Sequence, residues 1–143
     1  MAVGRGTVQA FYRYRNDGTE ILNPKETITT MSYQKYQECI DACLECAMQC
    51  EQCATACLQE DNIKMMLKCI QLDRDCADIC INTARLLARG SEHGVHLMRE
   101  CAEVCEKCAE ECEKYDYIDH CKMCAEACRR CAEECRSMSG QLA

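Results

Sequence analysis

Cysteine is the residue that could do chemistry in this chain, because 18 of its 143 residues are Cys and most follow one another at alternating steps of three and four. The densest run, CIDACLECAMQCEQCATAC, extends from Cys39 to Cys57. Residues three and four apart share one face of an α-helix, so these thiols form a single stripe at positions where apolar side chains normally pack against another helix. Such rows of sulfur offer two kinds of chemistry, coordination of soft metal ions and thiol oxidation.

Similar stripes occur in three further segments, of which the second along the chain is the loosest. In that segment the position between Cys69 and Cys76 falls on Leu72 or Asp73, depending on the phase of the helix. We favour Leu72, because Asp73 would place an acidic group beside the thiols, as a ligand or as the partner of one. The candidate metal ligands are the cysteines of all four stripes: Cys39, Cys43, Cys46, Cys50, Cys53, Cys57, Cys69, Cys76, Cys80, Cys101, Cys105, Cys108, Cys112, Cys121, Cys124, Cys128, Cys131 and Cys135.

A secreted disulfide scaffold is the usual explanation of such a high cysteine content. Stripe neighbours on one helix have Cβ atoms ~5–6 Å apart, whereas a disulfide prefers ~3.5–4.5 Å. The N-terminal sequence MAVGRGTVQAFYRYRND has no uninterrupted apolar run typical of a signal peptide, and no segment approaches transmembrane length. We therefore expect reduced thiols in the cytoplasm. Cysteine used only as a small hydrophobic residue would not explain this repetition, since Leu or Ala would pack better.

Among metals, the pattern favours Cu(I). Iron–sulfur clusters usually take their cysteines from compact loops, which a straight stripe does not provide. Zinc prefers four ligands, and each isolated Zn(Cys)₄ site carries two negative charges that are costly in a dry core. Cu(I) is soft and accepts two or three thiolates, and one Cu(I) per thiolate leaves the core neutral. This ratio predicts multiple Cu(I) ions per chain.

The elements that position the stripes are four expected helices, over residues 32–59, 62–89, 91–114 and 118–137. Glu60-Asp61-Asn62 and Tyr115-Asp116-Tyr117 are the expected first and third turns, Gly90 the glycine that ends the second helix, and Ser91 the N-cap of the third. Connections this short join antiparallel neighbours. The fold class is therefore all-α, an antiparallel up-down-up-down four-helix bundle with a Cys-lined core.

Residues 1–31 contain no cysteine and are expected to form an N-terminal extension, separate from the bundle domain at 32–143. Val8–Tyr14 and Thr19–Leu22 flank Asn16-Asp17-Gly18, which is typical of a short β-hairpin. A poorly ordered tail is the alternative.

In such a bundle the first and third turns share one end, which we interpret as the mouth through which metal enters. His120, beside a stripe cysteine, is the candidate non-cysteine ligand; the alternative is a solvated histidine near a loop. We favour Met65 and Met66 as packing residues rather than ligands. The expected mouth gathers Asn62, Met65, Met66, Cys69, Cys112, Tyr115, His120 and Cys121; the opposite, apolar plug contains Leu86, Leu87, Val95, Leu97 and Met98, with His93 and His96 at its surface.

The formal net charge of −7 argues against nucleic acid or an anionic membrane as a partner. From about Tyr33 to Met138 the sequence resembles the bacterial copper storage proteins, cysteine-rich four-helix bundles that fill with Cu(I). The resemblance is carried by YQKYQECIDACLECAMQCEQCATACLQED, by KCIQLDRDCADIC with ARLLARGSE, and by HCKMCAEACRRCAEECR. It does not cover residues 1–31.

The resemblance to the cytosolic branch of that family implies a homo-tetramer that holds copper along the bundle axis. It also implies that the 18 cysteines are the ligands and that His120 matches a histidine near the open end. The expected function is a non-enzymatic, cytosolic store that detoxifies Cu(I), supplied by a copper chaperone. A thiol redox buffer or oxidant sensor and a zinc-thiolate reservoir are the alternatives.

Overall fold

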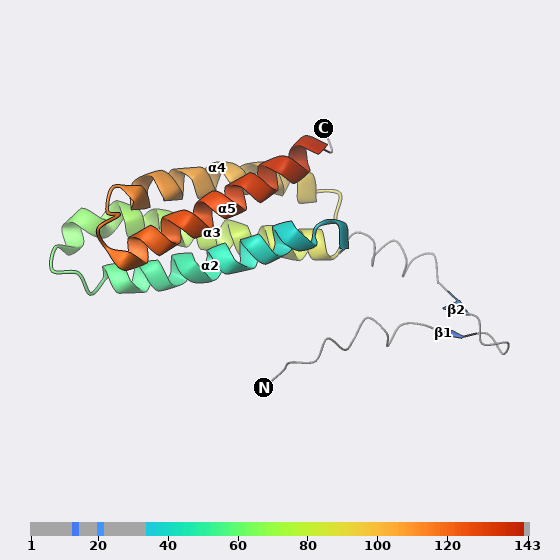
Figure 1. Ribbon diagram of the computed structural model, residues 1–143, viewed down its shortest axis with the longest axis horizontal. Helices are drawn as coiled ribbons and strands as arrows, with labels where there is room; N and C mark the ends of the chain where they lie inside the picture. Colours follow the sequence, from blue (N-terminus) through green and yellow to red (C-terminus); the bar gives the residue numbers. More distant parts are fainter. Residues whose placement is uncertain (1–12, 15–19, 22–33, 142–143) are drawn as a thin grey trace.

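The computed structural model describes residues 13–14, 20–21 and 34–141. They contain the strands β1 (Arg13–Tyr14) and β2 (Glu20–Ile21) and the helices α2 (Gln37–Cys57), α3 (Ile63–Ala88), α4 (Gly94–Glu113) and α5 (Asp119–Gln141). The four helices pack side by side as a four-helix bundle (Figure 1), as predicted. None of the helices in the described part of the chain combines the length and the apolar character that crossing a bilayer requires.

The two short strands pair antiparallel, with Arg13 opposite Ile21 and Tyr14 opposite Glu20. They fall within the segments that we expect to form a hairpin. The expected turn at Asn16-Asp17-Gly18 and the rest of both segments lie outside the described residues, so the complete hairpin stays a prediction.

Both ends of α3 are fixed by capping interactions. The side-chain oxygen of Asn62 accepts a hydrogen bond from the backbone N–H of Met65 at 3.3 Å, which makes Asn62 the N-cap. At the other end Gly90 has a φ of 66°, and the N–H groups of Gly90 and Ser91 donate to the carbonyls of Leu87 and Leu86. This is a Schellman motif, and it confirms the predicted C-terminal glycine.

The boundaries of the other helices differ from the predictions by a few residues. The residue before α4 is His93, so the prediction that Ser91 is the N-cap is wrong; the Ser91 hydroxyl instead accepts from the His93 N–H at 3.2 Å, within the preceding turn. The first helix begins at Gln37, because the helical conformation is interrupted at Tyr36, and α5 continues past Ser137 to Gln141.

The helices form a ring in which α2 contacts α3 and α5, and α4 contacts the same two. Cys57 near the end of α2 lies beside Cys69 near the start of α3, and Cys39 near the start of α2 lies beside Cys135 near the end of α5. The turns at 58–62 and 114–118 therefore lie at one end of the bundle, and the turn at 89–93 lies at the other (Figure 1).

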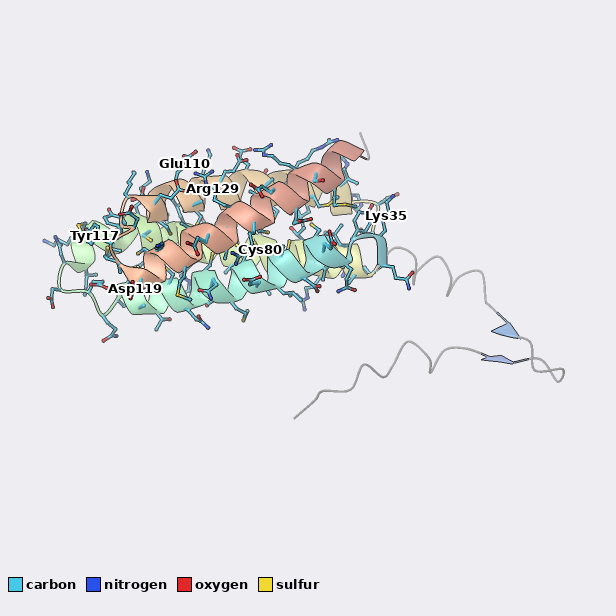
Figure 2. The ribbon with its side chains drawn as sticks, in the orientation of Figure 1. Lys35, Cys80, Glu110, Tyr117, Asp119 and Arg129 are labelled. Carbon is cyan, nitrogen blue, oxygen red and sulfur yellow. The ribbon has the colours of Figure 1, made fainter. Side chains whose placement is uncertain are left out.

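Cysteine supplies most of the core, since all 18 thiols are at most 1% exposed and few large apolar residues are buried in the described part of the chain. Sulfur fills the space between the helices, while charged side chains such as Glu110 and Arg129 point outward (Figure 2). Ion pairs on the surface join the helices: Arg129–Glu113 and Arg136–Glu106 link α5 to α4, and Arg130–Glu45 links α5 to α2.

Candidate metal centre

The thiols of the core are reduced and lie close to one another. All 18 cysteines are free. Neighbouring Sγ atoms of different helices are 3.3 Å apart at Cys39–Cys135 and 4.0 Å apart at Cys57–Cys69, and neighbours on one helix, such as Cys101 and Cys105, are 3.8 Å apart. A disulfide would need ~2 Å. The expectation of reduced, inward-facing thiols is therefore confirmed.

Many of the thiols form groups of four whose sulfur atoms lie within 4.8 Å of one another. The groups overlap, because Cys46, Cys50, Cys128 and Cys131 each belong to two of them. The sulfurs of these overlapping groups thus form a continuous column along the bundle axis, in which a single thiolate is close enough to bridge two metal ions. Four of these groups are Cys43–Cys101–Cys131–Cys135, Cys46–Cys80–Cys105–Cys131, Cys46–Cys50–Cys76–Cys128 and Cys50–Cys108–Cys124–Cys128.

The sulfur separations are those that a metal–thiolate site requires. With metal–sulfur bonds of ~2.3 Å, three thiolates around one ion are ~4.0 Å apart and four are ~3.8 Å apart. Distances such as 3.8 Å for Cys46–Cys76 and 3.9 Å for Cys46–Cys105 suit either geometry. The charge of the core distinguishes zinc from copper. Four thiolates per Zn²⁺ leave the core with a net negative charge, whereas one Cu(I) per thiolate leaves it neutral.

Burial favours the protonated form of the Cys57 thiol, near the end of α2. Removal from water raises the pKa of Cys57 above its ordinary range, and repulsion from the thiolates of Cys69 and Cys121 raises it further. A cation that binds here must therefore displace protons, so that binding couples to pH.

Asp73, and not Leu72, occupies the gap in the stripe of α3. The preference for Leu72 is thus wrong: Asp73 is 0% exposed, whereas Leu72 is only partly buried. The Asp73 Oδ1 atom accepts hydrogen bonds from the thiols of Cys108 at 3.1 Å and Cys124 at 3.2 Å. Its second oxygen lies 3.8 Å from the Cys69 sulfur.

Burial raises the pKa of Asp73 to about 9. The carboxyl group is therefore neutral at pH 7. The step pattern contained a signal for this position, because 69, 73, 76 and 80 repeat the steps of four, three and four seen in the other stripes, such as 101, 105, 108 and 112.

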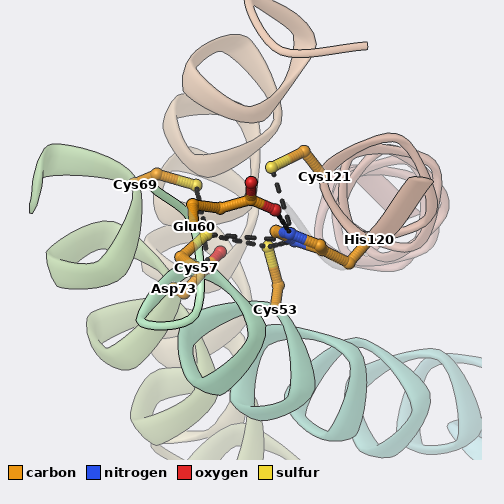
Figure 3. Close-up of polar contacts among 7 residues, drawn as sticks. All are labelled: Cys53, Cys57, Glu60, Cys69, Asp73, His120 and Cys121. Carbon is orange, nitrogen blue, oxygen red and sulfur yellow. Dashed lines mark hydrogen bonds and ion pairs between the residues drawn. The ribbon is translucent and has the colours of Figure 1, made fainter. Parts of the chain in front are cut away.

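His120 lies among thiols at the end of the bundle formed by the first and third turns (Figure 3). Its Nδ1 atom is 3.5 Å from the sulfurs of Cys53 and Cys121 and 3.9 Å from that of Cys57. These four residues form a further group with donor atoms within 4.8 Å of one another. His120 is thus only partly exposed, at 23% of its side chain, and faces thiols, while its role as a ligand stays a prediction. Sequence analysis missed Glu60, whose Oε1 lies 2.8 Å from the His120 Nε2 atom.

The remaining residues expected at the mouth and at the plug are partly buried and partly at the surface. Tyr115 donates a hydrogen bond from its hydroxyl to the carbonyl of Met65 at 3.1 Å, which joins the third turn to the start of α3. Met66 is buried in the core, as expected of a packing residue, whereas the Met65 side chain is exposed, which does not fit the packing role favoured for it. At the plug, Leu87 and Met98 are buried, and His93 and His96 are exposed, as predicted.

Comparison with known proteins agrees with this geometry. Residues 32–140 match the family described as copper storage protein. The chain is 44% identical over 107 residues to the cysteine-rich protein YhjQ of Bacillus subtilis, a match that covers 74% of this chain and 98% of the relative. Two solved structures are similar. Cu(I)-bound BsCsp3 from B. subtilis is 43% identical, with a TM-score of 0.70 over 73% of this chain and 98% of its own. A cytosolic copper storage protein from Streptomyces lividans, with five coppers, is 37% identical, with a TM-score of 0.73 over 78% and 97%.

Proposed function

This chain belongs to the copper storage protein family, and from that premise we propose that it stores and detoxifies Cu(I) in the cytoplasm, without catalysing a reaction. The observation that carries the proposal is that all 18 thiols are free and buried inside one bundle. Such a set of thiols binds many soft monovalent ions without accumulating charge.

The ligands that we propose are the 18 cysteines together with His120. Every one of these sulfurs faces the core, and the His120 Nδ1 atom points at three of them. The imidazole is partly exposed, with 23% of its side chain accessible, so it can meet an incoming ion before the buried thiols do. Copper would therefore enter at the end that carries His120.

The same contacts support an up-down-up-down order of the helices. The pairs Cys57–Cys69 and Cys39–Cys135 each join the end of one helix to the start of another. The proposed division into an extension at 1–31 and a bundle at 32–143 is supported by the family match, which begins at residue 32.

We also infer that the chain forms a homo-oligomer, a tetramer by family resemblance, and that a copper chaperone supplies the metal. Exposed apolar side chains on the bundle surface support association, among them Leu44 and Met48 on α2 and Met123 on α5. Sedimentation analysis of the reduced full-length protein measures the oligomeric state directly.

Titration of the reduced protein with Cu(I) against a chromogenic Cu(I) chelator tests the storage function. If one ion binds per thiolate, the protein withholds about 18 ions per chain from the chelator before the colour develops. Saturation at one or two ions per chain would refute storage.

A zinc-thiolate reservoir is the second candidate function, because zinc prefers four ligands and the core contains groups of four thiols. Metal analysis of the protein after growth in copper and in zinc separates the two functions, because a zinc store would retain zinc in both media. The thiol redox buffer requires accessible thiols, whereas these are at most 1% exposed. Alkylation of the folded, reduced protein should therefore be slow.

A further inference from the structure

His120 is held at both nitrogen atoms of its ring by groups of different chemistry. Its Nε2 atom lies 2.8 Å from the Oε1 atom of Glu60, which belongs to the turn between α2 and α3. Its Nδ1 atom faces the sulfurs of Cys53, Cys57 and Cys121 (Figure 3). Glu60 is thus the one residue in this view that contacts His120 from the side away from the thiols.

The chemistry of the two contacts determines where the imidazole proton resides. A neutral imidazole has one N–H donor and one nitrogen lone pair, and an ionised carboxylate only accepts hydrogen bonds. The contact with Glu60 therefore places the proton on Nε2 and leaves the lone pair on Nδ1. That lone pair points into the group of thiols, where a metal ion would be bound.

We propose that Glu60 is a positioning residue for copper loading, one that fixes His120 in the Nε2–H tautomer and so presents Nδ1 to the first Cu(I) ion. The inference rests on the proposed storage function, because it assigns a role within the loading step. A carboxylate that accepts the second N–H of a metal-binding histidine orients the ring and increases the basicity of the ligand nitrogen.

The position of Glu60 in the chain suits this role. The first turn carries Glu60, and the start of α5 carries His120, so their contact connects two segments that are 60 residues apart. Both side chains are partly exposed, at 35% for Glu60 and 23% for His120, whereas the thiols beneath are buried. Glu60 therefore orients the ring from the solvent side without occupying the space of the metal.

Nitrogen NMR of the histidine rings in the reduced, metal-free, full-length protein at pH 8 tests the tautomer. The chain has three histidines, so a His120→Gln variant assigns the signal. We expect the Nε2–H form in the unmodified protein and in Glu60→Gln, whose amide oxygen also accepts a hydrogen bond. Glu60→Ala should give a mixture of tautomers, and Asp61→Ala, at the next, exposed position of the turn, should change nothing.

The rate of uptake of the first Cu(I) ion, measured by stopped flow from a chromogenic Cu(I) complex, tests the consequence. Loss of a partner of this kind typically costs about 10–100-fold in metal affinity or activity, so we expect a slowing of that order in Glu60→Ala. Glu60→Gln and Asp61→Ala should load within about twofold of the unmodified protein, since both retain an acceptor for Nε2. Thermal unfolding of each variant verifies that the bundle is folded.

Two results would overturn the inference. An unchanged tautomer in Glu60→Ala would show that the thiols alone orient the ring. Equal slowing in Glu60→Gln and Glu60→Ala would show that the charge of Glu60 attracts copper and that its acceptor oxygen has no role. The NMR measurement needs no metal, so a protein that fails to store copper would still report on the tautomer, and the two failures remain distinguishable.

Discussion

The two halves of the sulfur column differ in the groups that accompany the thiols. Towards the turns at 58–62 and 114–118, cysteines share the core with His120 and Asp73, and Glu60 contacts the histidine from outside. Towards the turn at 89–93 the groups consist of thiols alone, and the buried side chains of Leu87 and Met98 close that end. We call these regions the mixed end and the thiol-only section.

The difference between the mixed end and the thiol-only section indicates how one column of sulfurs can both receive a metal ion and retain it. A buried thiol must lose a proton before it binds a metal, whereas the lone pair of a neutral imidazole is available at once. The mixed end therefore suits the first capture of Cu(I). The thiol-only section, where each thiolate is shared between sites, suits the neutral and long-lived filling of the interior.

The largest effect is expected from the removal of shared thiols in the thiol-only section. Cys46 and Cys131 each belong to two of the four-thiol groups named above, so the double variant Cys46→Ser/Cys131→Ser disturbs three of those groups. A serine hydroxyl is a poor ligand for a soft ion, and we expect the copper capacity to fall by about two to four ions per chain. Titration against a Cu(I) chelator measures this.

The matched control is Ala47→Ser/Ala132→Ser, which places the same two hydroxyls at neighbouring buried positions and removes no thiol. Its capacity should equal that of the unmodified protein. An unchanged capacity in the cysteine variant would mean that these thiols hold no copper.

Removal of His120 should affect the rate of loading and leave the capacity nearly intact. His120→Ala deletes the partly exposed nitrogen donor at the mixed end and preserves all 18 thiols. We expect uptake of the first ion to slow by about tenfold or more, and the final capacity to change by about one ion at most. His96→Ala, an exposed histidine at the plug, is the control. If both variants loaded at the same rate, the distinction between the two regions would not hold.

Periodicity alone predicted the larger features of the molecule. The steps of three and four residues determined the helices and the inward direction of every cysteine, and short polar connections indicated the turns. The glycine that ends α3 was also predicted from the sequence. The structure explains it, because Gly90 adopts a positive φ of 66° that other residues rarely adopt.

The features that were missed depend on partners far apart in the sequence. Both Leu72 and Asp73 satisfy the spacing of the stripe, and hydrophobicity favoured leucine. What makes Asp73 acceptable in the core is the set of thiol donors from α4 and α5, including Cys108 and Cys124. The contact of Glu60 with His120 joins the first turn to the start of α5 and leaves no local pattern in either one.

Replacement of Asp73 should make the stability of the metal-free protein less sensitive to pH. The pKa of Asp73 is raised to about 9 in the fold, compared with ~3.9 in an unfolded chain, so the folded state binds more protons between these values. Its contribution to stability is therefore full below pH ~4 and is lost as the pH rises towards 9.

Urea unfolding of the reduced protein at pH 5 and pH 7 measures this effect. The free energy of unfolding should fall by up to about 2–3 kcal/mol over this interval in the unmodified protein. In Asp73→Asn the fall should be much smaller, while Asp75→Asn, at an exposed position on the same helix, should behave like the unmodified protein. Parallel pH profiles in all three proteins would mean that Asp73 is ionised in the folded state.

The smallest effect is expected at the plug, where a substitution should change stability and leave copper loading unaffected. A Cβ atom added at Gly94 would lie 2.9 Å from the Leu87 Cδ2 atom, so the leucine must shift, at a cost of about 1 kcal/mol in Gly94→Ala. Gly140→Ala is the matched control, because its Cβ meets no atom within 4 Å and alanine favours a helix. Urea unfolding and stopped-flow loading are measured on both. If Gly94→Ala slowed the uptake of the first ion as strongly as His120→Ala, the assignment of first capture to the mixed end would not hold, because Gly94 packs against Leu87 at the opposite end of the bundle.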